Sequence, residues 1–298
     1  MENSLHNASN RNWYDKSYKL LLLIPVVILI LSLVYLGYFY NKTGDIMSKD
    51  SSLTGGTTIT INGNVDSKSL ESSLKSKFSD LSVRKLTDLR TGQPISTIID
   101  TSAKPAEIKP AIENFLGYKL TSENSSIEFT GPSLSQSFYR QLITALIISF
   151  ILMSITIFII FRTFIPSIAV IFAVFADIVM PLALMDYLGI KISAAGIAAF
   201  LMLIGYSVDT DILLTTRAIR TKGGTVNKRI YRAFKTGIFM TSTALVAVIP
   251  AFIIVSGLPD SFRQIFFILM LGLFADILNT WLTNASIIKW YCEAKKIE

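Results

Sequence analysis

The chain has 298 residues, of which 51% are hydrophobic and 16% are charged, and its mean hydropathy is +0.52. Soluble globular domains carry about 25% charged residues, so this composition excludes an ordinary soluble domain and indicates an integral membrane protein. The formal net charge is +7, but the basic residues do not form a stripe interleaved with aromatic side chains, which argues against a nucleic-acid partner.

Six apolar segments are long enough to cross a bilayer, since each crossing needs about 20 apolar residues. They are Leu20–Tyr40, Leu142–Phe161, Phe164–Leu188, Ile192–Leu214, Ile238–Gly257 and Ile265–Ile288. The first follows Arg11, Lys16 and Lys19 and lies far from any small-residue cleavage site, so we interpret it as an uncleaved anchor rather than a signal peptide. We therefore predict an α-helical membrane protein with six transmembrane helices, helices 2–6 within residues 139–288.

The distribution of Lys and Arg predicts the orientation, because cytoplasmic loops retain positive charge. The short segments on one side hold fourteen basic residues: Arg11, Lys16, Lys19, Arg162, Arg217, Arg220, Lys222, Lys228, Arg229, Arg232, Lys235, Lys289, Lys295 and Lys296. The short loops on the other side hold only Lys191 and Arg263. We therefore expect a multi-pass protein of the plasma membrane, with cytoplasmic tails at residues 1–19 and 289–298.

The polar block at residues 41–138 must then lie outside the cytoplasm. Its pattern predicts strands over Thr57–Ile61, Leu81–Leu89, Pro94–Asp100 and Ser126–Thr130, with helices over Ser67–Phe78 and Ala106–Leu116. The order βαββαβ is that of a ferredoxin-like α+β domain, which by itself says little about activity. The simplest interpretation of the block is a docking module.

Several kinds of chemistry lack the residues that they need. The chain has one cysteine, Cys292, and one histidine, His6, both in predicted tails, and it shows no phosphate-binding loop and no zinc-ligand spacing. We therefore expect no enzymatic activity, no cofactor and no metal.

Four acidic residues lie in or near the apolar segments: Asp177, Asp209, Asp211 and Asp276. A carboxylate is costly in hydrocarbon, so these residues are either paired or used to handle charge. On a helix Asp209 lies ~80° from Arg217 and Asp211 points away from both, which makes Asp209 the better neighbour for the arginine. The alternatives are that Asp177 only accepts hydrogen bonds from a neighbouring helix, and that Asp209, Asp211 and Arg217 are snorkelling charges at the inner membrane edge.

Asp276 lies near the middle of the sixth segment, with Asn279 and Thr280 on nearly the same face. It needs a polar partner, and the fifth segment offers Thr241 among its hydroxyls, although such hydroxyls often bond their own helix backbone instead. In the fourth segment, small residues from Ala194 to Gly205 predict close packing against other helices.

Four motifs in the same order resemble the SecF family of protein-export membrane proteins in its archaeal form. They are Gly55-Gly56-Thr57, Gly131-Pro132-Ser133-Leu134, Gly205-Tyr206-Ser207-Val208-Asp209-Thr210-Asp211 with Arg217, and Phe274-Ala275-Asp276-Ile277-Leu278-Asn279-Thr280-Trp281. The resemblance runs over nearly the whole chain.

This resemblance implies a proton-driven machine of the resistance-nodulation-division (RND) class, in which a six-helix SecF half pairs with a six-helix SecD half. It also implies association with the SecYE channel and outward movement of unfolded precursor proteins. Bacterial relatives carry His-Asp in the third helix and Asn-Asp in the fourth. Here Ala176-Asp177 and Asp209-Thr210 stand at those places. Asp177 and Arg217 match the family directly, whereas the histidine is absent and Thr210 replaces a carboxylate.

Three functions compete on the sequence alone. The first is an export subunit that acts with SecD and uses the proton motive force. The second is half of an RND-type exporter of small molecules or lipids, although such an exporter would need a larger substrate-binding domain. The third is a passive scaffold of the translocon. The basic loop from Arg217 to Lys235 has three candidate contacts, namely the channel, anionic membrane lipid and the ribosome, or it only sets the topology.

Overall fold

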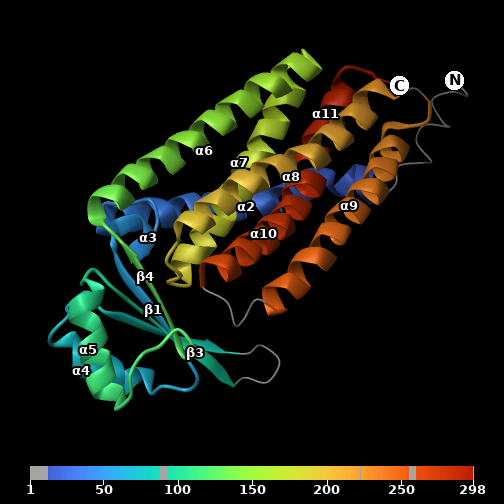
Figure 1. Cartoon of the computed structure of the whole chain (residues 1–298). Coiled ribbons are helices and arrows are strands. Elements are labelled where there is room, and N and C mark those ends of the chain that lie inside the picture. The colour runs from blue at the N-terminus through green and yellow to red at the C-terminus, as the bar shows by residue number, and fades with distance from the viewer. Residues whose placement is uncertain (1–12, 88–92, 222, 255–259, 298) are drawn as a thin grey trace, which may run out of the picture.

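The computed structural model describes residues 13–87, 93–221, 223–254 and 260–297. Long helices lie side by side in one bundle, and a small α+β domain sits at one end of it (Figure 1). Six helical spans are long and apolar enough to cross a membrane. They are formed by α2 (Trp13–Thr43), α6 (Pro132–Phe161), α7 (Phe164–Tyr187), α8 (Ala194–Arg220), α9 (Val226–Ile254) and the series α10 (Asp260–Leu278), η2 (Asn279–Asn284) and α11 (Ala285–Ala294).

Most of these helices run beyond the apolar segments seen in the sequence. Helix α6 begins at Pro132, where the proline fits the first helical position, and α8 continues to Arg220. An apolar segment marks only the part of a helix that hydrocarbon would cover, and the polar turns beyond it keep their backbone hydrogen bonds. The end of the fifth predicted segment at Gly257 and the end of the predicted strand at Leu89 lie outside the described residues.

The spans divide into inner and outer helices. About half of the most apolar stretch of α7, of α8 and of α10–α11 is buried, whereas α2, α6 and α9 expose most of theirs. Helix α8 packs against α6, α7, α9 and α10 and so forms the centre of the bundle. Polar side chains on α7, α8 and the α10–α11 series can therefore be shielded from lipid by the neighbouring helices.

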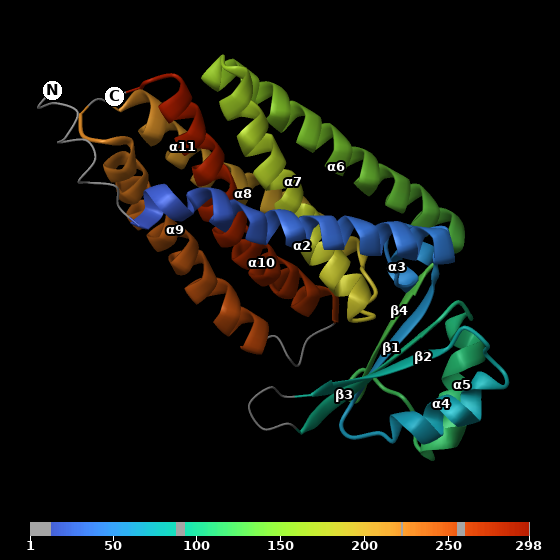
Figure 2. The ribbon, with the colours of Figure 1, turned by 180° about the vertical axis from the view of Figure 1, so that it is seen from behind.

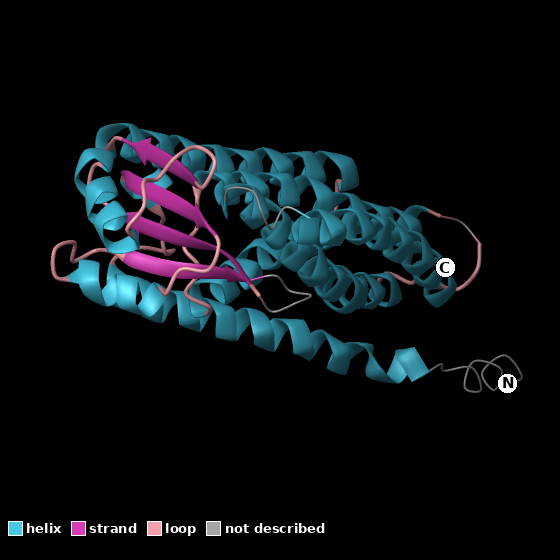
Figure 3. Cartoon of the chain, turned by 60° about the horizontal axis from the view of Figure 1, so that its bottom comes forward, coloured by secondary structure: helices cyan, strands magenta, loops and turns pink. Residues whose placement is uncertain are grey.

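The small domain has the βαββαβ order that the sequence pattern predicts. Its elements are β1 (Gly56–Asn62), α4 (Ser67–Lys75), β2 (Ser82–Thr87), β3 (Pro94–Thr101), α5 (Pro105–Leu116) and β4 (Ser125–Thr130), preceded by the short helix α3 (Ser51–Thr54). The strands pair antiparallel in the order β2-β3-β1-β4, and α4 and α5 cover one face of the sheet (Figure 3).

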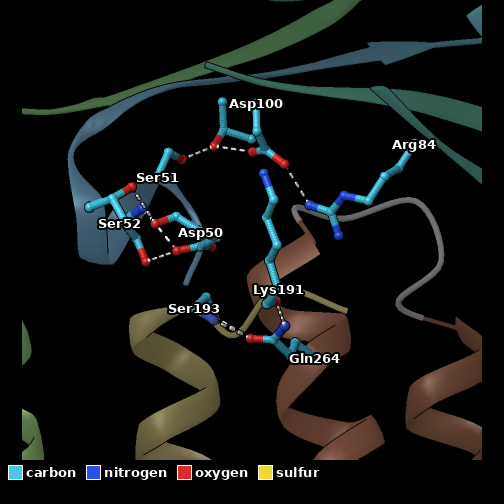
Figure 4. Close-up of polar contacts among 10 residues, drawn as sticks. Asp50, Ser51, Ser52, Arg84, Asp100, Lys191, Ser193 and Gln264 are labelled. Atoms are coloured by element: carbon cyan, nitrogen blue, oxygen red, sulfur yellow. Dashed lines mark hydrogen bonds and ion pairs between the residues drawn. The ribbon is translucent and has the colours of Figure 1, made fainter. Parts of the chain in front are cut away.

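The register of the sheet sorts the side chains by face. Ile59 pairs with Ile99 on one side and Ile127 on the other. Ile59 and Ile99 are fully buried beneath Leu70, Ile108 and other apolar residues of α4 and α5. Alternation along β1 turns Thr58 and Thr60 to the opposite face. That face carries Arg84 and Asp100, whose side chains form an ion pair of 2.7 Å near the helix ends (Figure 4).

Two of the glycine motifs meet where the domain joins the bundle. Gly55 ends α3 with φ of 86°, and a side chain there would collide with Pro132 at the start of α6. Glycine is therefore required for both the backbone angle and the close approach. This contact brings the chain entering the domain against the chain leaving it, as the view from behind shows (Figure 2).

The base of the domain is hydrogen-bonded to the loop between α7 and α8. The backbone N–H of Ile192 donates to the carbonyl of Ser48 at 2.6 Å, and the N–H of Asp50 donates back to the carbonyl of Ile192 at 3.1 Å. The N–H of Ala194, in the first turn of α8, donates to Ser52 Oγ at 2.9 Å. These bonds attach α3 and the residues before it to the N-terminal end of α8.

Helix α10 joins the same junction through Gln264. Its Oε1 accepts hydrogen bonds from the N–H and hydroxyl of Ser193, at 2.7 and 2.6 Å, and its Nε2 donates to the carbonyl of Lys191 at 2.6 Å (Figure 4). Both Ser193 and Gln264 are buried. The ends of α7, α8 and α10 nearest the domain are thus held together, and the domain rests on them.

Asp50 makes the stability of this junction depend on pH. Burial raises the pKa of Asp50 from its usual 3.8 to about 6, against hydrogen bonds from Ser52 that lower it, and nearby Asp100 raises it further. A raised pKa in the folded state means that stability is highest at low pH, falls as the pH rises from about 4 to about 6, and is constant above that. We expect Asp50→Asn, which keeps the helix cap, to stabilise the protein by about 1–2 kcal/mol at pH 7 and to leave it unchanged at pH 4. Thermal unfolding in detergent at both pH values measures this difference, and an equal shift at pH 4 and pH 7 would contradict it.

Candidate functional site

Three carboxyl groups from three inner helices meet inside the bundle. Asp177 of α7, Asp211 of α8 and Asp276 of α10 are each 0–1% exposed. They are surrounded by hydroxyl and amide side chains of α8, α9 and η2. We call Asp177, Asp211 and Asp276 with these hydrogen-bonding partners the carboxyl cluster.

Asp177 is held on both of its oxygens. Its Oδ2 accepts a short hydrogen bond from the hydroxyl of Ser207, and its Oδ1 accepts one from Asn279 Nδ2 at 2.6 Å. One turn later Pro181 lacks the N–H that would bond the backbone carbonyl of Asp177. The proline lies inside a continuous α7, so one backbone hydrogen bond is missing but the helix is not broken.

Asp276 lies between three hydroxyl groups. Its Oδ1 is 2.8 Å from Thr210 Oγ1 and 3.0 Å from Thr280 Oγ1, while its Oδ2 is 3.4 Å from Thr241 Oγ1. Thr241 of the fifth span is a partner that the sequence suggested, and Thr280 was expected on the same face as Asp276.

Asp211 is the third member of the cluster. Its Oδ1 accepts a hydrogen bond from Asn284 Nδ2 at 2.7 Å and lies 2.9 Å from Thr280 Oγ1. The same threonine oxygen therefore lies within hydrogen-bonding distance of two different carboxyl groups. The other oxygen of Asp211 is buried and has no hydrogen-bond partner among the described residues.

The π-helix η2 supplies half of these partners. A π-helix has a wider turn than an α-helix and occurs often at functional sites. Asn279, Thr280 and Asn284 all come from this six-residue segment and all reach carboxyl groups on other elements. The sequence predicts one transmembrane helix over Ile265–Ile288, and the helical span is continuous there, but it widens into the π-helix over Asn279–Asn284. The periodicity of the side chains does not show the extra residue in that turn.

No cation takes part in the hydrogen bonds that the structure describes for the three carboxyl groups. The partners are hydroxyl and amide groups, which stabilise a buried charge far less than an arginine or a lysine does. Three adjacent negative charges without a counterion are therefore strongly disfavoured.

The prediction that Asp209 is the neighbour of Arg217 is wrong. Arg217 Nη1 donates to the carbonyl of Arg232 at 3.0 Å and to Thr236 Oγ1 at 2.8 Å, so it ties α8 to α9. Asp209 is exposed on α8. The two residues are eight positions apart, which is about 12 Å along a helix, and the angular comparison ignored this rise. Asp211 points away from the arginine, as the sequence predicts, and it faces the centre of the bundle.

The exposed face of α8 carries three of the family-motif residues. Gly205, Tyr206 and Asp209 are exposed in a row along the helix. Gly205 has open space around its Cα, so it does not mediate helix packing within the described chain, contrary to the prediction. Gly196 does so, because a side chain there would collide with Gln264.

From the sequence, Ser207 and Thr210 were recognised only as residues of a motif, and Asn284 was missed. The signal was present as helical spacing, because Ser207 and Asp211 are four residues apart and so are Thr280 and Asn284. Two polar pairs at this spacing in apolar segments indicate two helix faces that meet each other.

The sequence is similar to known protein-export proteins. Residues 112–294 match the family described as Protein export membrane protein SecD/SecF, C-terminal. The protein-export membrane protein SecF of Methanolacinia petrolearia is 35% identical over 275 residues, which cover 92% of this chain and 93% of that protein. SecF of Methanocaldococcus jannaschii is 36% identical over 292 residues, which cover 95% of this chain and 99% of that protein.

The fold is similar to a solved structure. The crystal structure of SecDF from Thermus thermophilus, a translocon-associated membrane protein, superposes with a TM-score of 0.76 at 17% identity. The match covers 96% of this chain and 39% of that longer chain. Together, the family match, the full-length relatives and the six helical spans establish that the chain belongs to the SecF family of multi-pass protein-export membrane proteins.

Proposed function

We propose that this chain couples movement of protons through the carboxyl cluster to export of unfolded precursor proteins, as the partner of a SecD subunit at the SecYE channel. The observation that carries the proposal is the Thr280 hydroxyl, which lies 2.9 Å from Asp211 Oδ1 and 3.0 Å from Asp276 Oδ1. The three carboxyl groups and Thr280 form the coupling site, and Asp209 and Arg217 act at its edges.

A hydroxyl group has one proton to donate. If both carboxyl groups were ionised, Thr280 could donate to only one of them, and the other contact would bring two oxygens together without a hydrogen between them. A proton on one carboxyl group resolves this, since that group donates to Thr280 while Thr280 donates to the other. The geometry therefore favours a shared proton, and reversing both donors would pass it from one carboxyl group to the other.

Thr210 extends the same chain toward Asp177. Its hydroxyl lies 2.8 Å from Asp276 Oδ1 and 2.9 Å from the carbonyl of Ser207, the residue whose side chain bonds Asp177. A carbonyl only accepts hydrogen bonds, so Thr210 donates either to it or to Asp276. At the fourth-helix position where the family resemblance implies a second carboxylate, this chain thus has the hydroxyl of Thr210, which contacts the cluster.

The exposed face of α8 supports a SecD partner. A carboxylate on a lipid-facing helix surface is costly, so Asp209 is best accommodated against a second membrane protein. Tyr206, one turn away, is also exposed (54%), and Gly205 beside it leaves space for close helix contact. The longer SecDF chain, of which this chain covers 39%, has room for such a second half.

The charge distribution supports an orientation with both termini in the cytoplasm of the cell and the α+β domain outside. Both ends of the described chain lie at one end of the bundle, together with the basic loop that joins α8 to α9, and the domain lies at the other (Figure 1). One elementary charge moving through 100 mV releases about 2.3 kcal/mol. That energy can shift α7, α8 and α10 against each other, and the junction at Gln264 and Ser193 would pass the shift to the domain.

Replacement of Asp177 by Asn tests this function. The change keeps the shape and one hydrogen-bonding oxygen but removes the ability to exchange a proton. In membrane vesicles that contain SecD and the channel, we expect Asp177→Asn to abolish the part of export of a secreted reporter that depends on the proton gradient, a loss of about tenfold or more. Export at the normal rate under a full gradient would refute the proposal.

The amount of SecD that co-purifies with the chain distinguishes this function from that of a passive scaffold. If Asp177 is only structural, Asp177→Asn should lower the amount of SecD that co-purifies and should reduce export equally with and without the gradient. Ser32 offers a matched control, because Ser32→Ala alters a buried polar side chain of α2 that takes no part in the hydrogen bonds described for the carboxyl cluster. Its export should be normal in both conditions.

A further inference from the structure

A groove at the basic end of the bundle has features that the export function does not use. It lies between the start of α2, the first half of α9 and η2, and it encloses about 560 Å³. Four aromatic side chains line it, those of Tyr14, Tyr231, Phe234 and Trp281. Tyr231 is 61% exposed, so the groove opens to the side of the bundle.

Trp281 forms the inner wall of the groove. The residue is buried, and its ring packs against Phe234 at 5.2 Å between centroids and against Gly237, where any side chain would collide with it. These contacts hold the ring in place, so Trp281 gives the groove a fixed apolar wall.

The rim of the groove is positively charged. Lys228 lines it, and the stretch from Arg217 to Lys235 contains seven basic residues and no acidic one. Asp15 of α2, which follows the lining residue Tyr14, accepts hydrogen bonds from Asn227 and Lys289. The charge near the opening therefore favours an anionic occupant.

We propose that this groove binds an anionic membrane lipid, with the phosphate at Lys228 and the chain along Tyr14, Phe234 and Trp281. The groove is apolar beside the membrane-spanning helices and has aromatic and basic residues at one end. This arrangement matches the division of a lipid into acyl chain and headgroup. Trp281 follows Thr280 directly in η2. A lipid in the groove would therefore brace the segment that holds the carboxyl cluster.

Quenching of Trp281 fluorescence by brominated lipid tests the proposal. The full chain, with the other two tryptophans replaced by phenylalanine, is placed in vesicles of phosphatidylcholine that contain increasing fractions of brominated phosphatidylglycerol. The comparison vesicles contain brominated phosphatidylcholine instead. We expect saturable quenching at a low fraction of the anionic lipid, and about fivefold weaker apparent affinity in Lys228→Gln, since one basic residue near the surface contributes roughly that factor.

Lys16→Gln is the matched control. It removes the same charge at the same end of the molecule, from an exposed position of α2 that does not line the groove, and the affinity should stay within about twofold. Equal quenching by the two lipids, or equal effects of Lys16→Gln and Lys228→Gln, would overturn the proposal in favour of general contact with the membrane. Absence of quenching in both vesicles would also overturn it, because a second copy or the chain's own first residues would then fill the groove.

Discussion

Replacement of Thr280 by Val is expected to remove most of the proton-dependent export while the fold is retained. Valine has nearly the shape of threonine but cannot donate to Asp211 or Asp276, the two carboxyl groups that share the Thr280 hydroxyl. The proton then has no short path between them, and we expect the gradient-dependent export rate to fall by about tenfold or more. Loss of the shared donor also costs about 1–3 kcal/mol of stability, which thermal unfolding in detergent measures.

Two further variants make this experiment specific. Thr280→Ser keeps the hydroxyl and should restore most of the export. Thr283→Val changes a buried threonine of the same η2 whose hydroxyl has no hydrogen-bond partner among the described residues, so it should leave both export and stability nearly unchanged. If Thr283→Val and Thr280→Val reduce export equally, the effect belongs to the packing of η2 and not to the shared hydroxyl.

Removal of the negative charge at Asp15 is expected to destabilise the whole bundle. Lys289 of α11 is 1% exposed; it forms a short ion pair with Asp15 and lies over the rings of Tyr14 and Tyr18, at 4.4 and 4.8 Å from their centroids. Glu293 is 4.0 Å away and half exposed. Asp15→Asn leaves a buried cation without its main partner, and we expect a loss of about 3 kcal/mol.

Lys289→Met should be far less harmful than Asp15→Asn, because it removes the buried charge itself. Asp15 is partly exposed and keeps the hydrogen bond from Asn227 at 2.7 Å, so we expect a cost below about 1 kcal/mol. The double variant should recover most of the stability lost in Asp15→Asn. Thermal unfolding of the three purified proteins in the same detergent measures these differences, and a double variant no more stable than Asp15→Asn would contradict the ion-pair explanation.

The carboxyl cluster gives the acidic residues of the apolar segments different roles. Asp177, Asp211 and Asp276 are enclosed by the chain itself, while Asp209 faces outward on α8. Under the proposed function, the first three exchange protons and Asp209 meets the partner subunit. The basic residue Arg217 joins α8 to α9 instead of neutralising a carboxylate within this chain. A cation for the cluster would therefore come from the partner or be replaced by a proton.

The sequence by itself determined the spans, the order of elements in the α+β domain and the presence of intramembrane acids. These features rest on local physics, since apolar length and side-chain period follow from neighbours along the chain. The domain shows this well, because turn residues and alternating isoleucines predict β1 within one residue of its observed ends at Gly56 and Asn62.

Only the tertiary structure decided which acids belong together. Asp209 and Asp211 are two residues apart and point to different faces, and which face is inside depends on how α7, α9 and α10 pack around α8. The π-helix at Asn279–Asn284 is likewise set by those neighbours, because the wider turn brings Asn279, Thr280 and Asn284 to their carboxyl partners. Helical spacing can show which face of each helix is polar, but it cannot match partners that are 66 to 102 residues apart in sequence, so their pairing is a property of the folded bundle.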